Sequence, residues 1–129
     1  MPLERATRCR GEHTGRRPSA FSRWHRSSLP SWAWACDLDL IEVRHGRGIV
    51  AVAEHAQVDG RPTAKRARAI ARCKPLQLGV VREVAAALRV PGLFILHDDL
   101  AERFGVLDVR TDAVRELDEA GMRRLLGDL

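Results

Sequence analysis

The sequence predicts an α/β fold in which a small mixed β-sheet is flanked by helices. Three observations lead to this prediction. Two strand-like segments flank a glycine turn within residues 36–56, two helical stretches follow, and two further strand-like segments precede a terminal helix. The order strand, strand, helix, helix, strand, strand, helix is typical of sheets covered by helices. A chain of 129 residues has the usual length of one domain.

The first predicted element is a β-hairpin. Residues 36–45 alternate with the period of two that is typical of a strand, and both faces carry apolar side chains, as in an inner strand. The turn at residues 45–48 contains two glycines, which tolerate a left-handed backbone. Residues 49–53 form a continuous apolar, β-branched run. This run predicts a buried strand that ends at Glu54.

Two helices are predicted after the hairpin. Pro62 can open the first one, and residues 63–73 are rich in alanine and arginine, which favour helix. Pro75 interrupts it. Residues 76–89 carry an apolar stripe at three- and four-residue spacing, which predicts the clearest helix of the chain.

The last predicted elements are two strands and a helix. Residues 93–96 are continuously apolar, and residues 104–109 alternate, so both segments are expected in the sheet. Asp118 is a plausible N-cap, and Leu117 before it can contact Met122 inside the terminal helix.

The composition indicates a soluble cytoplasmic protein. Residues 1–30 hold seven arginines and two glutamates, and we expect a basic, poorly ordered N-terminal arm ahead of one domain at residues 31–129. Three cysteines without close pairing favour a reducing compartment over a disulfide framework. The apolar runs are too short to cross a bilayer, and no apolar signal core follows the basic N-terminus.

A second basic segment follows the predicted hairpin. Residues 61–74 carry six basic residues and no acidic one, which points to a polyanionic partner. Taken alone, the segment is equally compatible with a solvated helix face. The candidate phosphate contacts are Arg61, Lys65, Arg66, Arg68, Arg72 and Lys74.

Asp39 and Glu54 place carboxylates on the two strands of the hairpin. They lie at equal distances along the chain on either side of the turn, so they are nearly opposite each other. Because paired strands lie about 4.8 Å apart, the two carboxylates can meet near the open end of the hairpin. Mg²⁺ or Mn²⁺ would neutralise their repulsion and polarise a phosphodiester oxygen. The alternative is a pair of edge residues that are solvated or bound to arginines.

Residues 36–56 resemble the core hairpin of the PD-(D/E)XK nuclease superfamily, especially its small RecB-like and very-short-patch-like members. The family signature is an Asp on one strand, an apolar run on the next strand and then Glu-x-Lys, and Asp39 and Glu54 occupy its acidic positions. The resemblance covers roughly residues 36–110. It implies a restriction-endonuclease-like core and metal-dependent hydrolysis of nucleic acid, DNA rather than RNA. It also implies Asp39 and Glu54 as ligands of Mg²⁺ or Mn²⁺, the backbone carbonyl of His55 as a further ligand, and Asp37 as a supporting carboxylate.

The chain departs from the family signature at Ala56, where the family has lysine. That lysine is thought to orient or activate the attacking water, and a methyl group does neither. Lys65 on the next helix is the candidate replacement, so the predicted catalytic residues are Asp39, Glu54 and Lys65. Two alternatives to an endonuclease stay open. One is an inactive nucleic-acid-binding module on the same fold, and the other is a protein-interaction domain that uses the acidic C-terminal segment.

Overall fold

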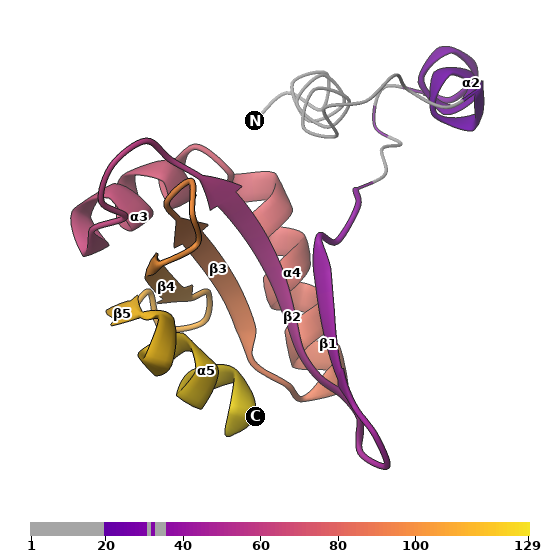
Figure 1. Ribbon diagram of the computed structural model, residues 1–129. Coiled ribbons are helices and arrows are strands. Elements are labelled where there is room, and N and C mark those ends of the chain that lie inside the picture. Colours follow the sequence, from indigo (N-terminus) through magenta and orange to yellow (C-terminus); the bar gives the residue numbers. More distant parts are fainter. Residues whose placement is uncertain (1–19, 31, 33–35) are drawn as a thin grey trace. The chain divides into compact units, whose positions relative to one another are not determined.

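The computed structural model describes residues 20–30, 32 and 36–129 (Figure 1). The chain divides into two compact units, Met1–Asp37 and Leu38–Leu129. The described part of the first unit contains the helix α2 at Ala20–Ser28. Most of the expected poorly ordered arm, residues 1–19, lies outside the described residues, and α2 occupies much of the remainder.

The second unit is built on a five-stranded sheet with the strand order β1-β2-β3-β4-β5. β2 and β3 run parallel, whereas the other neighbouring strands run antiparallel. The predicted α/β fold with a mixed sheet is therefore confirmed. The strands are β1 (Leu40–Arg44), β2 (Gly48–Gln57), β3 (Gly92–His97), β4 (Arg103–Asp108) and β5 (Val114–Asp118).

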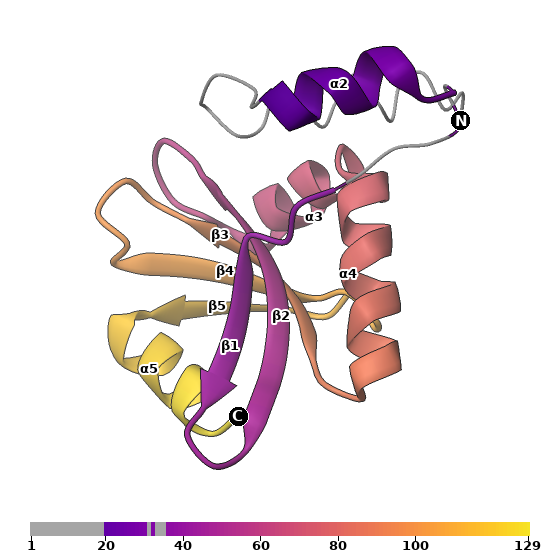
Figure 2. The ribbon, with the colours of Figure 1, turned by 90° about the vertical axis from the view of Figure 1, so that its right-hand side faces the viewer.

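Helices cover both faces of the sheet. The parallel pair needs a crossover connection, and the helices α3 (Ala64–Arg72) and α4 (Pro75–Leu88) supply it. Figure 2 shows α4 on one side of the sheet and α5 (Glu119–Gly127) on the other. The core under α3 and α4 includes the fully buried side chains of Val52, Val81, Phe94 and Leu96. The core under α5 includes Ala53, Leu93, Ile95, Val106 and Met122.

The helices begin where the sequence signals place them. Thr63 caps α3, because its Oγ1 accepts a hydrogen bond from the N–H of Arg66 at 3.2 Å. Pro75 is the first residue of α4, a position where a missing N–H costs nothing. Asp118 is the N-cap of α5 as predicted, and its Oδ1 accepts from the N–H of Gly121 at 2.7 Å. None of the helices in the described part of the chain has the length and apolar character that a membrane span needs.

Three strands differ from the prediction. β1 spans only Leu40–Arg44 of the predicted residues 36–45, and it is not the predicted inner strand, because it lies at the sheet edge, pairs only with β2 and has no fully buried side chain. β5 was not predicted, because its sequence contains no apolar run. It pairs only with β4 at the sheet edge, and most of its side chains are exposed. β2 continues past its expected end at Glu54 and reaches Gln57. Glu54 therefore lies inside a strand that is paired with β3, rather than at a strand end.

The turn of the β1–β2 hairpin is held against the C-terminal end of α5. Gly46 and Gly48 adopt φ values of 77° and 80°, as the glycine turn predicts. Arg44 Nη2 donates a hydrogen bond to the carbonyl oxygen of Leu126 at 2.6 Å, and Arg47 Nη1 donates to that of Leu129 at 2.6 Å. Leu126 O also accepts from the N–H of Leu129 at 3.4 Å, so Arg44 adds a charged donor to a carbonyl at the end of α5.

Candidate functional site

The predicted carboxylates Asp39 and Glu54 face each other across the first two strands. The β1–β2 register ends with Leu40 opposite Ala53, so the next opposed positions are Asp39 and Glu54. Asp39 lies directly before β1, and its Oδ2 accepts a hydrogen bond from the backbone N–H of His55 at 3.1 Å. The structure thus brings together the two carboxyl groups, which we call the Asp39–Glu54 pair.

Glu54 is buried. Its exposed fraction is 5%, and among the described residues it is the only charged one in the core. It shares the face of β2 that α3 and α4 cover, because alternate residues of a strand point the same way and Val52 lies in that core. Burial, followed by the hydrogen bond and the charge of Asp39, raises the pKa of Glu54 from 4.5 to about 7. The pair therefore retains a proton close to neutral pH.

Lys74 is the cation that acts on Glu54. Its charge lowers the pKa of Glu54, opposing the larger effect of burial. Lys74 is half-buried between α3 and α4, where its N–H donates to Ala71 O and its carbonyl accepts from the N–H of Leu78, both at 3.0 Å. Its backbone is therefore fixed by both helices.

The sequence contains only a weak signal for this role of Lys74. A lysine directly before Pro75 is restricted in backbone conformation, and the structure shows φ −123° and ψ 44° at Lys74. That restriction predicts a helix junction. It does not predict that the junction lies over Glu54, because this depends on how the crossover packs on β2. The sequence therefore predicts Lys74 only as a phosphate contact.

Lys65, the predicted replacement for the family lysine, is exposed on α3. It is not among the charged groups that shift the pKa of Glu54, whereas Lys74 is. The catalytic role of Lys65 stays a prediction. The structure offers Lys74 as the lysine whose charge acts on Glu54.

The arginines of the predicted phosphate-binding set have different surroundings. Arg66 holds the loop before α3, since its Nη1 donates to Asp59 O at 2.6 Å and to Arg61 O at 3.0 Å. Arg61 Nε lies 3.8 Å from a carboxylate oxygen on β5. Arg68 and Arg72 line a surface pocket between α3, α4 and the end of β4. Arg66 therefore has a structural contact, while Arg68 and Arg72 face a concave surface.

Asp37 and Ala56 are the two remaining positions named by the resemblance. Asp37 falls in the first compact unit, whereas Asp39 and Glu54 belong to the second. Its supporting role stays a prediction. Ala56 is half-buried and packs against the core under α3 and α4. A small apolar side chain suits this position, which explains how the fold accommodates the departure from the family signature.

His55 presents its backbone to the Asp39–Glu54 pair. Its N–H points towards Asp39, and in an extended strand the carbonyl of the same residue points to the same side. The ladder between β1 and β2 ends at Leu40 and Ala53, so the His55 carbonyl lies beyond it. The His55 ring lies on the other face of the sheet, with its centroid 5.6 Å from that of His97. The backbone of His55, and not its imidazole, belongs to the candidate site.

The donor set of the Asp39–Glu54 pair fits a hard cation with retained waters. Within residues 20–30, 32 and 36–129, no cluster of three or more His, Cys, Asp or Glu side chains forms a metal site. Mg²⁺ is commonly bound by one or two carboxylates and several waters, while structural zinc needs four protein ligands. Two carboxyl groups beside a backbone carbonyl are enough ligands for Mg²⁺ but too few for structural zinc. The raised pKa of Glu54 also marks a place where a divalent cation can replace a proton.

Comparison of the chain with protein-family models, with curated proteins and with solved structures found no match.

Proposed function

We propose that this protein hydrolyses phosphodiester bonds of nucleic acid with the help of a divalent metal ion, on a restriction-endonuclease-like core. The observation that carries the proposal is the Asp39–Glu54 pair itself. A buried carboxyl group faces a second carboxyl group, its pKa is raised to about 7, and the charge of Lys74 acts on it. Strongly perturbed carboxyl groups of this kind are enriched at functional sites, because burying them without a purpose destabilises the fold.

The residues around the pair have separable roles in this proposal. Asp39 and Glu54 hold the cation, and the N–H of His55 fixes the orientation of Asp39. Lys74 stabilises negative charge that develops on the phosphate, the task that the family assigns to a lysine at position 56. A bound Mg²⁺ or Mn²⁺ would supply charge neutralisation and activate water.

The basic surface of α3 supports a polyanionic substrate. Lys65, Arg68 and Arg72 lie on α3, the helix that leads directly to Lys74. Arg68 and Arg72 are exposed, and within the described residues neither takes part in an ion pair. Such arginines bind a phosphate backbone and position it without reading its sequence.

The proposal is tested by incubating the purified protein with plasmid, linear and single-stranded DNA in Mg²⁺ or Mn²⁺. We expect cleavage by the wild type and loss of cleavage in Glu54→Gln and Asp39→Asn. Glu83→Gln is the matched control, because Glu83 is an exposed carboxylate on α4. Cleavage that persists in Glu54→Gln would disprove the assignment of the pair.

A non-catalytic nucleic-acid-binding module is the second candidate, and Ala56 favours it. Where the family has its catalytic lysine, this chain has the half-buried methyl group of Ala56, which packs against the core. In that case neither the wild type nor Glu54→Gln cleaves DNA, and both retard it in a gel with steep dependence on salt concentration. The same set of proteins therefore separates the two candidates.

A further inference from the structure

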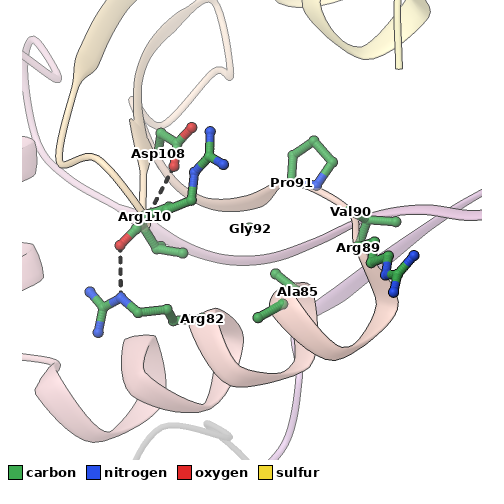
Figure 3. A pocket seen from close by; sticks show the side chains of 10 residues that line it. Arg82, Ala85, Arg89, Val90, Pro91, Gly92, Asp108 and Arg110 are labelled. Carbon is green, nitrogen blue, oxygen red and sulfur yellow. Dashed lines mark hydrogen bonds between the residues drawn. The ribbon is translucent and has the colours of Figure 1, made fainter.

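A pocket of about 530 Å³ lies beside the C-terminal half of α4, at the end of β4 (Figure 3). Its apolar lining comes from the end of α4, the segment that leads into β3 and the residue after β4. These residues are Ala85, Ala86, Val90, Pro91, Gly92 and Val109. Pockets that bind small organic ligands typically measure roughly 300–1,000 Å³. The pocket is thus large enough for a ligand with an organic body.

Three arginines surround this apolar lining, and we call the whole the arginine pocket. Arg82 and Arg89 come from α4 and its C-cap, and Arg110 follows β4. Within the described residues, none of the three forms an ion pair. Arg82 is held in place by a hydrogen bond from its Nε to Val109 O at 2.9 Å (Figure 3). Its terminal nitrogens remain as donors for a ligand.

Asp108 is the acidic residue that lines the arginine pocket. Its Oδ1 accepts hydrogen bonds from the backbone N–H groups of Arg110 at 2.8 Å and Thr111 at 3.4 Å. Oδ2 makes no hydrogen bond within the described residues, so it can accept one from a ligand. The charges that line the pocket are three positive and one negative. They favour an anion that also carries hydrogen-bond donors.

A smaller pocket of about 300 Å³ adjoins the arginine pocket and shares Arg82 and Val109 with it. Arg68 and Arg72 line it, and Asp112 is its acidic residue. Two adjoining pockets with arginines in both match a ligand whose phosphates repeat along a chain. A single inorganic anion would leave one pocket and all of the apolar lining unused.

We propose that the arginine pocket binds one nucleotide unit. Its phosphate lies against the guanidinium group of Arg89 at one end of the pocket, and its sugar and base lie against the apolar lining and against Asp108 and Arg110 at the other end (Figure 3). Arginine suits this ligand because its planar fork binds phosphate and its face stacks on bases. The nucleotide belongs either to a free mononucleotide or to a strand whose next phosphate enters the smaller pocket. Both sources share the same recognition chemistry.

The proposed nucleotide site does not depend on hydrolysis at the Asp39–Glu54 pair. The two sites share no residue, since the pocket is lined by the middle and C-terminal parts of α4 and the end of β4. A protein that never cleaves DNA can still bind a nucleotide here. Glu54→Gln is therefore expected to abolish cleavage and to leave mononucleotide affinity unchanged.

Isothermal titration calorimetry on the full chain tests the proposal. The probes are a nucleoside monophosphate, the uncharged nucleoside, inorganic phosphate and a short single-stranded oligonucleotide, all at one ionic strength. We expect the double variant Arg89→Gln/Arg110→Gln to lose about tenfold or more in affinity for the nucleotide probe that binds wild type. The matched control is Arg103→Gln/Arg115→Gln, which removes the same charge from exposed positions outside both pockets.

The probes also identify the source of the nucleotide. Tighter binding of the oligonucleotide, weakened by Arg68→Gln/Arg72→Gln, assigns a strand that spans both pockets. Tighter binding of the monophosphate, unaffected by that variant, assigns a free nucleotide. Three results would overturn the proposal: equal affinity for inorganic phosphate, an equal loss in the control variant, or loss of mononucleotide binding in Glu54→Gln. Circular dichroism confirms that each variant is folded.

Discussion

The charged groups at the two ends of α4 differ in how far they are buried. At its N-terminal end, the charge of Lys74 acts on Glu54, and Glu54 is 5% exposed. At its C-terminal end, exposed arginines surround a pocket that is open to solvent. Burial changes the proton affinity of a carboxyl group and so equips it for chemistry. Exposure keeps guanidinium groups available to bind a ligand, but it does not give them a role in a proton transfer or a bond-breaking step.

The largest expected effect is that of removing Lys74, and the comparison of the two ends fails if cleavage does not need this lysine. We expect Lys74→Met to lower the kcat of DNA cleavage by about 100-fold or more, the usual effect of removing one group that stabilises charge in a transition state. Lys65→Met, measured in the same assay, is expected to raise KM and to change kcat little, because Lys65 is exposed on α3. Equal losses of kcat in both variants would place Lys65 in the site after all.

The pH dependence of stability is the next largest expected effect. The pKa of Glu54 is raised from 4.5 to about 7, so the folded state binds more protons than the unfolded state between these values. The free energy of unfolding should therefore fall as the pH rises from about 4.5 through about 7, by an amount on the order of 3 kcal/mol.

Urea unfolding of the metal-free protein at several pH values measures this fall. Glu54→Gln should abolish it, and Glu83→Gln should keep it. In wild type, Mg²⁺ or Mn²⁺ should raise the melting temperature above pH 7 by binding the deprotonated pair, and Glu54→Gln should not respond. A fall of the same size in Glu54→Gln would assign the effect to another group.

A substitution at Gly92, which lines the arginine pocket, tests the difference between the two ends. It should lower the free energy of unfolding without changing the pKa of Glu54. A Cβ at Gly92 would lie 2.8 Å from Val109 Cγ2 and 3.0 Å from Ala85 Cβ. Gly92→Ala should therefore cost about 1–3 kcal/mol of unfolding free energy through overpacking. Gly79→Ala, where a Cβ meets nothing within 4 Å, is the control on the same side of the sheet. A change in the pH profile of Gly92→Ala would show that the two ends are coupled.

The smallest expected effect concerns Arg66 on α3, outside both ends of α4. Arg66→Gln removes the hydrogen bonds to Asp59 O and Arg61 O, and we expect it to cost about 1 kcal/mol in urea unfolding. DNA retardation should change no more than in Arg115→Gln, since Arg66 is already engaged by the protein. A selective loss of DNA affinity in Arg66→Gln would return it to the set of phosphate contacts.

Local patterns predicted much of the fold. The glycine turn, the apolar run of β2 and the N-cap Asp118 each carry their own signal, and each forms as expected. β5 was missed because an edge strand that is mostly exposed needs no apolar run. Counting outward from Gly46 and Arg47 predicted the opposition of Asp39 and Glu54. The observed turn pairs Arg44 with Gly48, and the register shift between Glu42 and Val43 is what brings Asp39 opposite Glu54.

The rest of the candidate site depends on contacts between distant segments. The charge of Lys74 acts on Glu54 because the crossover packs α4 against β2, and no spacing along the chain encodes that packing. The arginine pocket combines Arg82 and Arg89 from α4 with Arg110 from the end of β4. In the sequence these are three scattered arginines outside the basic segment at residues 61–74. Only the packing of α4 against the sheet brings them together.

The single parallel pairing has a consequence for the order of folding. β1 and β2 form a hairpin, and β3, β4 and β5 form a meander, so both parts have contacts that are local in sequence. Val52 and Gly92, the first partners of the parallel pair, are separated by both crossover helices. Pairings of such large sequence separation are slow to form. We expect the hairpin and the meander to form early and to join late, and Glu54 to become buried only when they join. Proton uptake during refolding near pH 6 would then report the closing step of the fold.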